Sequence, residues 1–309
     1  MANNKFQGVW PALITPLDER GQPNHAAVEQ LVELFVSQNV PGLYILGSTG
    51  QWPLLPLQHR REVAERVVQC AAGRISVMVH VGALATDDAA GLAGHAESIG
   101  ATAVSAVGPV YYSFSVDDVF LHYERIGSAS NLPLFVYHLS HVNQVSIPAP
   151  DYARRVLDLP NVGGIKFTDH DLFTLAQIHE TAGERLQLFS GADPLFCHAA
   201  LSGAVGAIGS FFNVWAAPAQ KARDRFVAGD FEVGRRFTAA FQSAISEVLG
   251  RGAIWTFLRS AMLLRYNIDV GMPRGPLGRR DVEWEEDHVR KIVKRVEDSC
   301  ESVNAERAV

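Results

Sequence analysis

Two short apolar runs, LPLFVYH at residues 132–138 and VGGIKF at residues 162–167, decide the fold. Both are apolar on each face, which is typical of parallel strands that are covered on both sides. The segment between them has a helical pattern at 149–158, so the three together predict a β–α–β unit.

The same alternation continues on either side of this unit. Further strand-like runs lie at residues 8–15, 42–47, 75–82, 102–109, 186–191 and 204–210. Helices are expected at 24–38, 56–72, 87–99, 116–129, 171–182 and 194–202, with caps or first-turn residues such as Asp87, Ser115 and Asp169. Eight strands, each followed by a helix, predict the α/β fold known as the (β/α)8 or TIM barrel. A doubly wound open sheet is the rival, although it usually has fewer strands and a phosphate loop after the first.

The C-terminal part of the chain has a different pattern. Residues 216–266 read as two or three helices without a strand signal. A Pro/Gly-rich segment at 266–281 precedes a charged amphipathic helix at 282–299. We therefore predict a barrel domain over residues 1–225 and a C-terminal helical extension over residues 226–309.

Composition excludes several classes of protein. The 309 residues carry a net charge of −6, which argues against binding to nucleic acid. No apolar run approaches the ~20 residues that cross a membrane, and no secretory signal is visible. Cys70, Cys197 and Cys300 are far apart and favour a reducing cytoplasm. His138 and His141 lack an evident third ligand, so no metal site is predicted.

Polar residues follow several predicted strands, at the end of the barrel where active sites of this fold lie. In GSTGQ, Ser48 and Thr49 stand between two glycines, which makes the segment either a simple turn or a nest for a carboxylate. Tyr137 lies near the end of its strand, either as a packing residue of the barrel or as a proton donor and acceptor.

Lys166 is the most informative of these residues because it ends an apolar run. Desolvation would lower the pKa of such an amine, and a neutral amine can attack a ketone to form a Schiff base. The alternative is a lysine paired with a carboxylate such as Asp169 or Asp193. Its combination with Tyr137, one strand back, and with the hydroxyl nest favours chemistry.

Five more residues follow strands and have less specific patterns. Tyr111 and Tyr112 would point at the barrel mouth or at a subunit contact, although packing is the commoner role. Gly209 would let the backbone approach a ligand, and Ser210 offers a hydroxyl. Asp193 would cap the next helix, bind substrate hydroxyls, or do both.

These motifs, in this order, resemble those of the pyruvate-dependent class I aldolase family, whose best-known branches are N-acetylneuraminate lyase and dihydrodipicolinate synthase. The matching segments are GVWPALITPLD, GSTGQ, VYYSFSVDD, FVYHLS, GGIKFTD, SGAD and GAIGS. The resemblance implies a lyase that reversibly cleaves an N-acetylneuraminate-like 2-keto-3-deoxy sugar acid to pyruvate and an aldehyde. It also implies a homotetramer, arranged as a dimer of dimers, and a covalent imine in place of any metal or organic cofactor.

The resemblance assigns roles to the matched residues. Lys166 would form the imine, and Tyr137 would move the proton during carbon–carbon cleavage. Ser48 and Thr49 would bind the pyruvate carboxylate. Thr49 would also link Tyr137 to Tyr111, which in this family reaches in from a neighbouring subunit.

The remaining matched residues would contact the substrate. Gly209 would place a carbonyl near the keto acid, and Thr168 would touch the substrate beyond it. Asp193 and Ser210 complete the predicted substrate-binding set.

Several positions depart from the family pattern. Val142 stands where dihydrodipicolinate synthases have an arginine for a second carboxylate, which favours the N-acetylneuraminate lyase branch. Pro194 replaces the glutamate that holds the glycerol tail of sialic acid, so a smaller sugar acid or an aromatic aldehyde is an alternative substrate part. Gln51 and Ser140 replace a glutamate and a proline.

Two further hypotheses therefore stay open. One is a synthase-type condensing enzyme or a keto-deoxy-sugar-acid dehydratase on the same scaffold. The other is a non-catalytic protein that binds keto acids.

Overall fold

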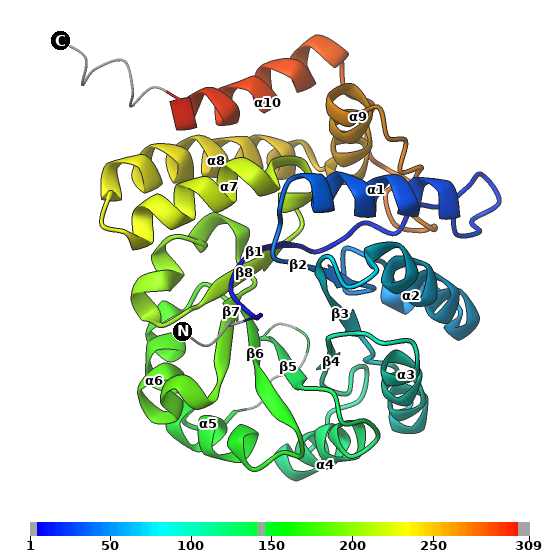
Figure 1. Cartoon of the computed structure of the whole chain (residues 1–309), viewed down its shortest axis with the longest axis vertical. Helices are drawn as coiled ribbons and strands as arrows, with labels where there is room; N and C mark the ends of the chain where they lie inside the picture. The colour runs from blue at the N-terminus through cyan, green and yellow to red at the C-terminus, as the bar shows by residue number, and fades with distance from the viewer. Residues whose placement is uncertain (1–4, 141, 143–145, 302–309) are drawn as a thin grey trace.

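The computed structural model describes residues 5–140, 142 and 146–301, and it contains a barrel of parallel strands (Figure 1). The strands are β1 (Gly8–Pro11), β2 (Gly42–Ile45), β3 (Ser76–His80), β4 (Ala103–Val107), β5 (Leu134–Leu139), β6 (Val162–Thr168), β7 (Gln187–Ser190) and β8 (Gly206–Gly209). They pair in the order β1-β8-β7-β6-β5-β4-β3-β2. A parallel bridge between Ala12 and Tyr44 joins β1 to β2 and closes the ring, so the predicted TIM barrel is confirmed.

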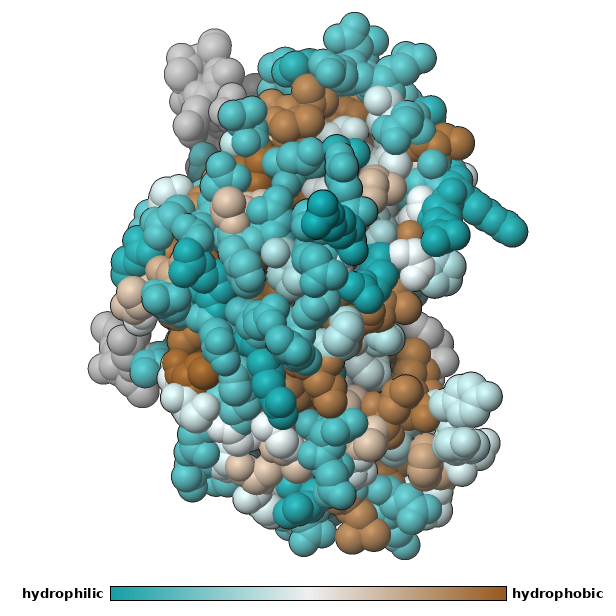
Figure 2. Space-filling model, turned by 90° about the vertical axis from the view of Figure 1, so that its right-hand side faces the viewer, coloured by the Kyte–Doolittle hydropathy of each residue, from teal (hydrophilic) through white to brown (hydrophobic). Residues whose placement is uncertain are grey.

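Helices cover the outside of the barrel. They are α1 (His25–Ser37), α2 (Leu57–Ala71), α3 (Thr86–Ser98), α4 (Val116–Gly127), α5 (Ala149–Leu157), α6 (Leu172–Ala182) and α7 (Phe212–Val227). Each outer helix has to bury an apolar stripe against the sheet, which leaves its polar side to solvent. The face on the side of α1, α2 and α3 is accordingly mostly hydrophilic, with small hydrophobic groups between the polar ones (Figure 2).

The helix predicted at 194–202 is wrong. Two short 3-10 turns, η3 (Asp193–Leu195) and η4 (His198–Ser202), take its place. Gly203 ends the second turn with a φ of 89°, in the left-handed region, so the chain turns into β8 before an α-helix can develop. Two other 3-10 turns are η1 (Trp52–Leu54) and η2 (Gly183–Arg185).

Two predicted helix starts are confirmed and one is wrong. Ser115 caps α4 in a capping box with Asp118, and Asp87 lies in the first turn of α3. Asp169 does not cap α6, because the cap is Asp171, whose carboxylate accepts a hydrogen bond from the Thr174 N–H. The Asp169 carboxylate instead accepts from the Asp171 N–H at 2.9 Å.

Beyond the barrel lie α8 (Phe231–Arg251), α9 (Ile254–Tyr266) and α10 (Glu286–Glu301), as the helical pattern of this region predicts. They stack with α7 at one end of the molecule (Figure 1). The predicted boundary between the two domains falls inside α7, which packs against β1 as well as α8. None of the helices in the described ranges combines the length and hydropathy needed to cross a membrane.

The interior of the barrel is packed with large apolar side chains. Trp10, Phe135 and Phe189 make edge-to-face contacts, with ring centroids 5.4 Å apart for Trp10–Phe189 and 5.9 Å for Phe135–Phe189. Side chains two residues apart on a strand share a face. The next inward positions on β5 and β6 are therefore Tyr137 and Lys166, which lie side by side in the register.

Candidate active site

Lys166 is enclosed at the C-terminal end of β6, where only 4% of the residue is exposed. Its Nζ lies 3.9 Å from the ring centroid of Tyr137 and 4.3 Å from that of Tyr44. Aromatic faces attract a cation, whether an ammonium or an iminium. In the described part of the chain these rings hold the amine, and no ion pair with Asp169 or Asp193 does.

Tyr137 is the phenol next to this amine. Its OH lies 3.4 Å from Ser48 Oγ, within hydrogen-bonding distance. Burial alone would raise the pKa of Tyr137, but the positive charge of Lys166 and the hydrogen bond with Ser48 more than offset it, so the pKa is lowered. A phenol with a lowered pKa, beside an amine, is suited to transferring a proton.

The predicted hydrogen-bond link from the Thr49 hydroxyl to Tyr137 is wrong for residues of the same chain. Thr49 Oγ1 lies 2.6 Å from Ser210 Oγ, and the hydroxyl beside Tyr137 is that of Ser48. The two neighbouring residues of the loop thus turn their hydroxyls to different partners. Tyr111 is 89% exposed and has a φ of 83°, so it reaches no part of this cluster in its own chain.

Asp193 lies across the mouth from this pair, at the start of η3. Its Oδ2 accepts a 2.7 Å hydrogen bond from the N–H of Phe211, the residue that precedes α7. Burial raises the pKa of Asp193 to about 6, although the Phe211 N–H and the charge of Lys166 act in the opposite direction. The predicted cap of the next helix is therefore wrong, because no α-helix forms at 194–202, and the Asp193 carboxylate instead contacts the chain just before α7.

Gly209, which was predicted to let the backbone approach a ligand, leaves room for a neighbouring side chain in this structure. A Cβ on this residue would lie 2.2 Å from Asp193 Oδ1, so the absent side chain makes room for that carboxyl group. The Gly209 carbonyl accepts a 2.9 Å hydrogen bond from the Ala12 N–H, which ties β8 to the end of β1.

His80 is a buried residue of this region that the sequence pattern did not single out. Its Nδ1 lies 3.1 Å from the Leu46 carbonyl, and its Nε2 accepts a hydrogen bond from the Val107 N–H. Burial, together with the charges of Arg60 and Lys166, holds the pKa of His80 well below its usual value. The imidazole is thus neutral and adds no second charge beside the amine.

Tyr44 and Arg60 were also missed. Tyr44 points its ring at Lys166 while its OH bonds Ser105 Oγ at 3.3 Å. Arg60 is buried and donates to the carbonyls of Gly82 and His80. Tyr44 is the one polar side chain in the apolar run GLYILG, so the sequence could have suggested that it faces the barrel interior. No sequence pattern indicates that Arg60 is buried near the site.

Gln51, which replaces a glutamate of the family, holds the loop in place. It is buried, its Nε2 donates to the Thr15 carbonyl, and its Oε1 accepts from the Arg274 N–H at 2.7 Å. An uncharged amide can satisfy both a carbonyl and an N–H, which a carboxylate cannot. This substitution therefore fits its surroundings.

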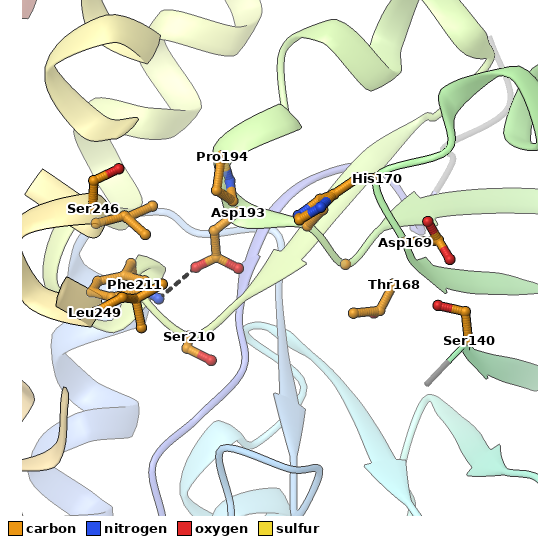
Figure 3. Close-up of a pocket in the computed structure, with 13 residues that line it drawn as sticks. Ser140, Thr168, Asp169, His170, Asp193, Pro194, Ser210, Phe211, Ser246 and Leu249 are labelled. Carbon is orange, nitrogen blue, oxygen red and sulfur yellow. Dashed lines mark hydrogen bonds between the residues drawn. The ribbon is translucent and has the colours of Figure 1, made fainter. Parts of the chain in front are cut away.

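A pocket of about 440 Å³ opens above these residues, between the ends of β5 to β8 and helix α8 (Figure 3). Thr168, Asp193 and Ser210, all predicted to bind substrate, line it together. Thr168 lies on the same inward face of β6 as Lys166, two residues further along the strand, although Lys166 and Tyr137 are not among the residues that line the pocket. Val142, which stands where dihydrodipicolinate synthases have an arginine, is 41% exposed. His141, which was considered as a metal ligand, lies outside the described residues.

Comparison with known proteins identifies the family. Residues 5–296 match the model of the dihydrodipicolinate synthetase family. N-acetylneuraminate lyase of Escherichia coli K12 is 32% identical over 285 residues, which cover 92% of this chain and 95% of that protein. Among solved structures, N-acetylneuraminate lyase from Mycoplasma synoviae has a TM-score of 0.85 at 28% identity, covering 97% of this chain and 99% of that one. Sialic acid aldolase from Ruminococcus gnavus shares the fold, with a TM-score of 0.89 at 24% identity, covering 96% and 99% of the two chains. The chain therefore belongs to the dihydrodipicolinate synthetase family and is a lyase of the class I aldolase type.

Proposed function

We propose that the protein reversibly cleaves an N-acetylneuraminate-like 2-keto-3-deoxy acid into pyruvate and an aldehyde, through an imine on Lys166. The observation that carries the proposal is the enclosed amine of Lys166, 3.9 Å from the ring of Tyr137. An amine attacks the keto group, water leaves, and the resulting iminium nitrogen accepts the electrons of the breaking carbon–carbon bond. This chemistry needs neither a metal nor an organic cofactor.

Ser48 and Thr49 are proposed to bind the carboxylate of the keto acid. Support comes from the buried Thr49, whose hydroxyl already pairs with Ser210, and from Ser48, whose hydroxyl faces Tyr137. Hydroxyls and backbone N–H groups of a tight loop suit a carboxylate. Binding there would place the keto carbon over Lys166.

Tyr137 is proposed to remove the proton from the substrate hydroxyl as the bond breaks. The aldehyde then leaves, the enamine takes up a proton at its terminal carbon, and water releases pyruvate from Lys166. The lowered pKa of the Tyr137 phenol supports this role, because the proton has to move in both directions.

We also propose that the active unit is a homotetramer, with Tyr111 entering the site of a neighbouring subunit. Support comes from an exposed aromatic group before α4, formed by Tyr111, Tyr112 and Phe114, in which the first two rings are 5.0 Å apart. Exposed apolar groups of this size often mark contacts between proteins. A cytoplasmic location remains a prediction.

The test is incubation with N-acetylneuraminate, with pyruvate measured by a coupled lactate dehydrogenase assay and all products by mass spectrometry. Release of pyruvate with N-acetylmannosamine supports the lyase. A product that keeps every substrate carbon would instead support a dehydratase, and the absence of any turnover of 2-keto-3-deoxy acids would support a binding protein.

A further inference from the structure

The pocket above Lys166 has two ends of different chemistry (Figure 3). At the end formed by β5 and β6, Ser140, Thr168 and Asp169 present oxygen atoms. Thr168 Oγ1 is buried against Gly191 and makes no hydrogen bond of good geometry within the described residues, although its proximity helps to lower the pKa of Tyr137. A buried polar atom without a partner is costly, so a ligand hydroxyl at this point would be stabilised.

The opposite end is formed by η3, Phe211 and helix α8, and it is largely apolar. Pro194 and Leu249 lie there (Figure 3), and Ile245 also lines the pocket. Pro194 has no N–H, and its carbonyl already accepts a 2.7 Å hydrogen bond from Gln242 Nε2. Ser246 adds one hydroxyl on an exposed turn of α8. This end of the pocket therefore has few hydrogen-bond donors or acceptors for a substrate chain that carries several hydroxyl groups.

The pocket also lacks a partner for an anion. No lysine or arginine stands among the lining residues that the structure describes, and the exposed His170 is the one lining side chain able to become a cation. Asp169 and Asp193 are both carboxyl groups, and hydrogen bonds from Ser140 and backbone N–H groups keep the pKa of Asp169 low despite burial. A second carboxylate or a phosphate on the substrate would meet repulsion here.

We propose that the aldehyde half of the substrate is uncharged, carries one hydroxyl next to its carbonyl, and ends in an apolar tail. The hydroxyl would bond Thr168, and the tail would lie on Pro194, Ile245 and Leu249. The proposal rests on the proposed function. In the synthetic direction, C3 of the pyruvate enamine bonds to the aldehyde carbon, the aldehyde oxygen takes a proton from Tyr137, and water then frees the product from Lys166. No oxidant or reductant takes part.

The test compares kcat/KM for addition of pyruvate to four aldehydes. Glyceraldehyde and 2-hydroxybutanal have the same number of heavy atoms and differ in a terminal hydroxyl or methyl, 2-hydroxyhexanal extends the apolar tail, and glyceraldehyde 3-phosphate adds charge. We expect 2-hydroxyhexanal to exceed 2-hydroxybutanal by about tenfold, since two added methylenes would be buried, and to exceed glyceraldehyde by at least as much. The phosphate should be the poorest substrate. Equal or better use of glyceraldehyde or its phosphate would overturn the proposal.

Substitutions test whether the apolar tail of the aldehyde binds at the proposed end of the pocket. Leu249→Ser, on an exposed turn of α8, should lower the 2-hydroxyhexanal to glyceraldehyde ratio about threefold or more, because apolar contact area is lost. Leu263→Ser, at a leucine of α9 that is 42% exposed and lies outside the pocket, should leave the ratio unchanged. Pro194→Glu should also lower the ratio. Equal ratios in Leu249→Ser and Leu263→Ser would overturn the placement of the tail.

A control separates failure of this proposal from failure of the proposed function. The same preparation is treated with pyruvate and borohydride, and a reduced adduct shows that the imine forms. An adduct together with a preference for glyceraldehyde would refute the apolar tail alone. The absence of any adduct would refute the function on which the proposal rests.

Discussion

The inner faces of neighbouring strands carry two layers of opposite character. In the lower layer, Phe135 and Phe189 meet edge to face at 5.9 Å inside an apolar cluster. In the upper layer, Tyr137 and Lys166 meet at 3.9 Å, with polar groups around them. Tyr137 lies two residues beyond Phe135 on β5, whereas Lys166 on β6 is paired in register with both Tyr137 and Phe189. On β5, one strand period therefore separates a side chain that packs the interior from one placed beside the amine.

The largest expected effect comes from Lys166→Ala, which removes the amine of the upper layer. We expect turnover to fall by about ten-thousandfold or more, because no other group in this site can form the imine. Thermal unfolding should change little, since the lower layer is intact. The steady-state rate of pyruvate release measures turnover, and a melting curve measures thermal stability. Activity equal to that of the wild type would refute the role of Lys166.

Tyr137→Phe should be the next most damaging change to catalysis. Loss of the phenol should slow turnover about a thousandfold while imine formation continues, because proton transfer and imine chemistry are separate steps. Tyr44→Phe is the matched control. Its ring also faces Lys166, but its OH bonds Ser105, so its effect on kcat should be about tenfold or less. Equal losses in both variants would contradict the assignment.

Phe135→Ala probes the lower layer. Truncation of this buried ring should cost about 3–4 kcal/mol of unfolding free energy, through lost burial and the cavity that remains. Phe173→Ala, at a ring that is 72% exposed, should change stability by about 0.5 kcal/mol or less. Urea unfolding compares the two. If the folded Phe135→Ala protein still traps pyruvate with borohydride, the separation of the layers holds.

Asp193→Asn tests the buried carboxyl group through its pH dependence. The folded-state pKa of about 6 lies above the reference value of 3.8, so ionisation of Asp193 disfavours the folded state. The free energy of unfolding of the wild type, relative to Asp193→Asn, should fall as pH rises from about 4 to about 6, by on the order of 3 kcal/mol at most. Urea unfolding of both proteins over this range measures the difference. A difference that stays constant with pH would refute the raised pKa.

The sequence predicted the barrel because its strands are apolar on both faces. The neighbouring positions of Tyr137 and Lys166 were also predicted, since consecutive parallel strands pair and each residue is the last but one of its run. The short turns at 193–202 were missed because a helical pattern does not record how soon the chain must enter β8.

Partners set by tertiary packing could not be predicted. Asp169 and Asp171 are equally good caps by residue type, and only the position of the helix start decides between them. Thr49 pairs with Ser210 across the barrel mouth, a contact between residues far apart in the chain. His80 and Arg60 are single polar residues among apolar ones, and their hydrogen bonds to backbone carbonyls leave no sequence pattern.

The central claim is that the enclosed amine of Lys166 forms an imine with a keto acid. Its most direct test is the intact mass of the protein after incubation with pyruvate and borohydride, followed by peptide mapping of the wild type and of Lys166→Ala. We predict one reduced pyruvyl adduct per chain, located on Lys166 and absent from the variant. An unmodified wild-type chain, or an adduct on another lysine that persists in Lys166→Ala, would contradict the account.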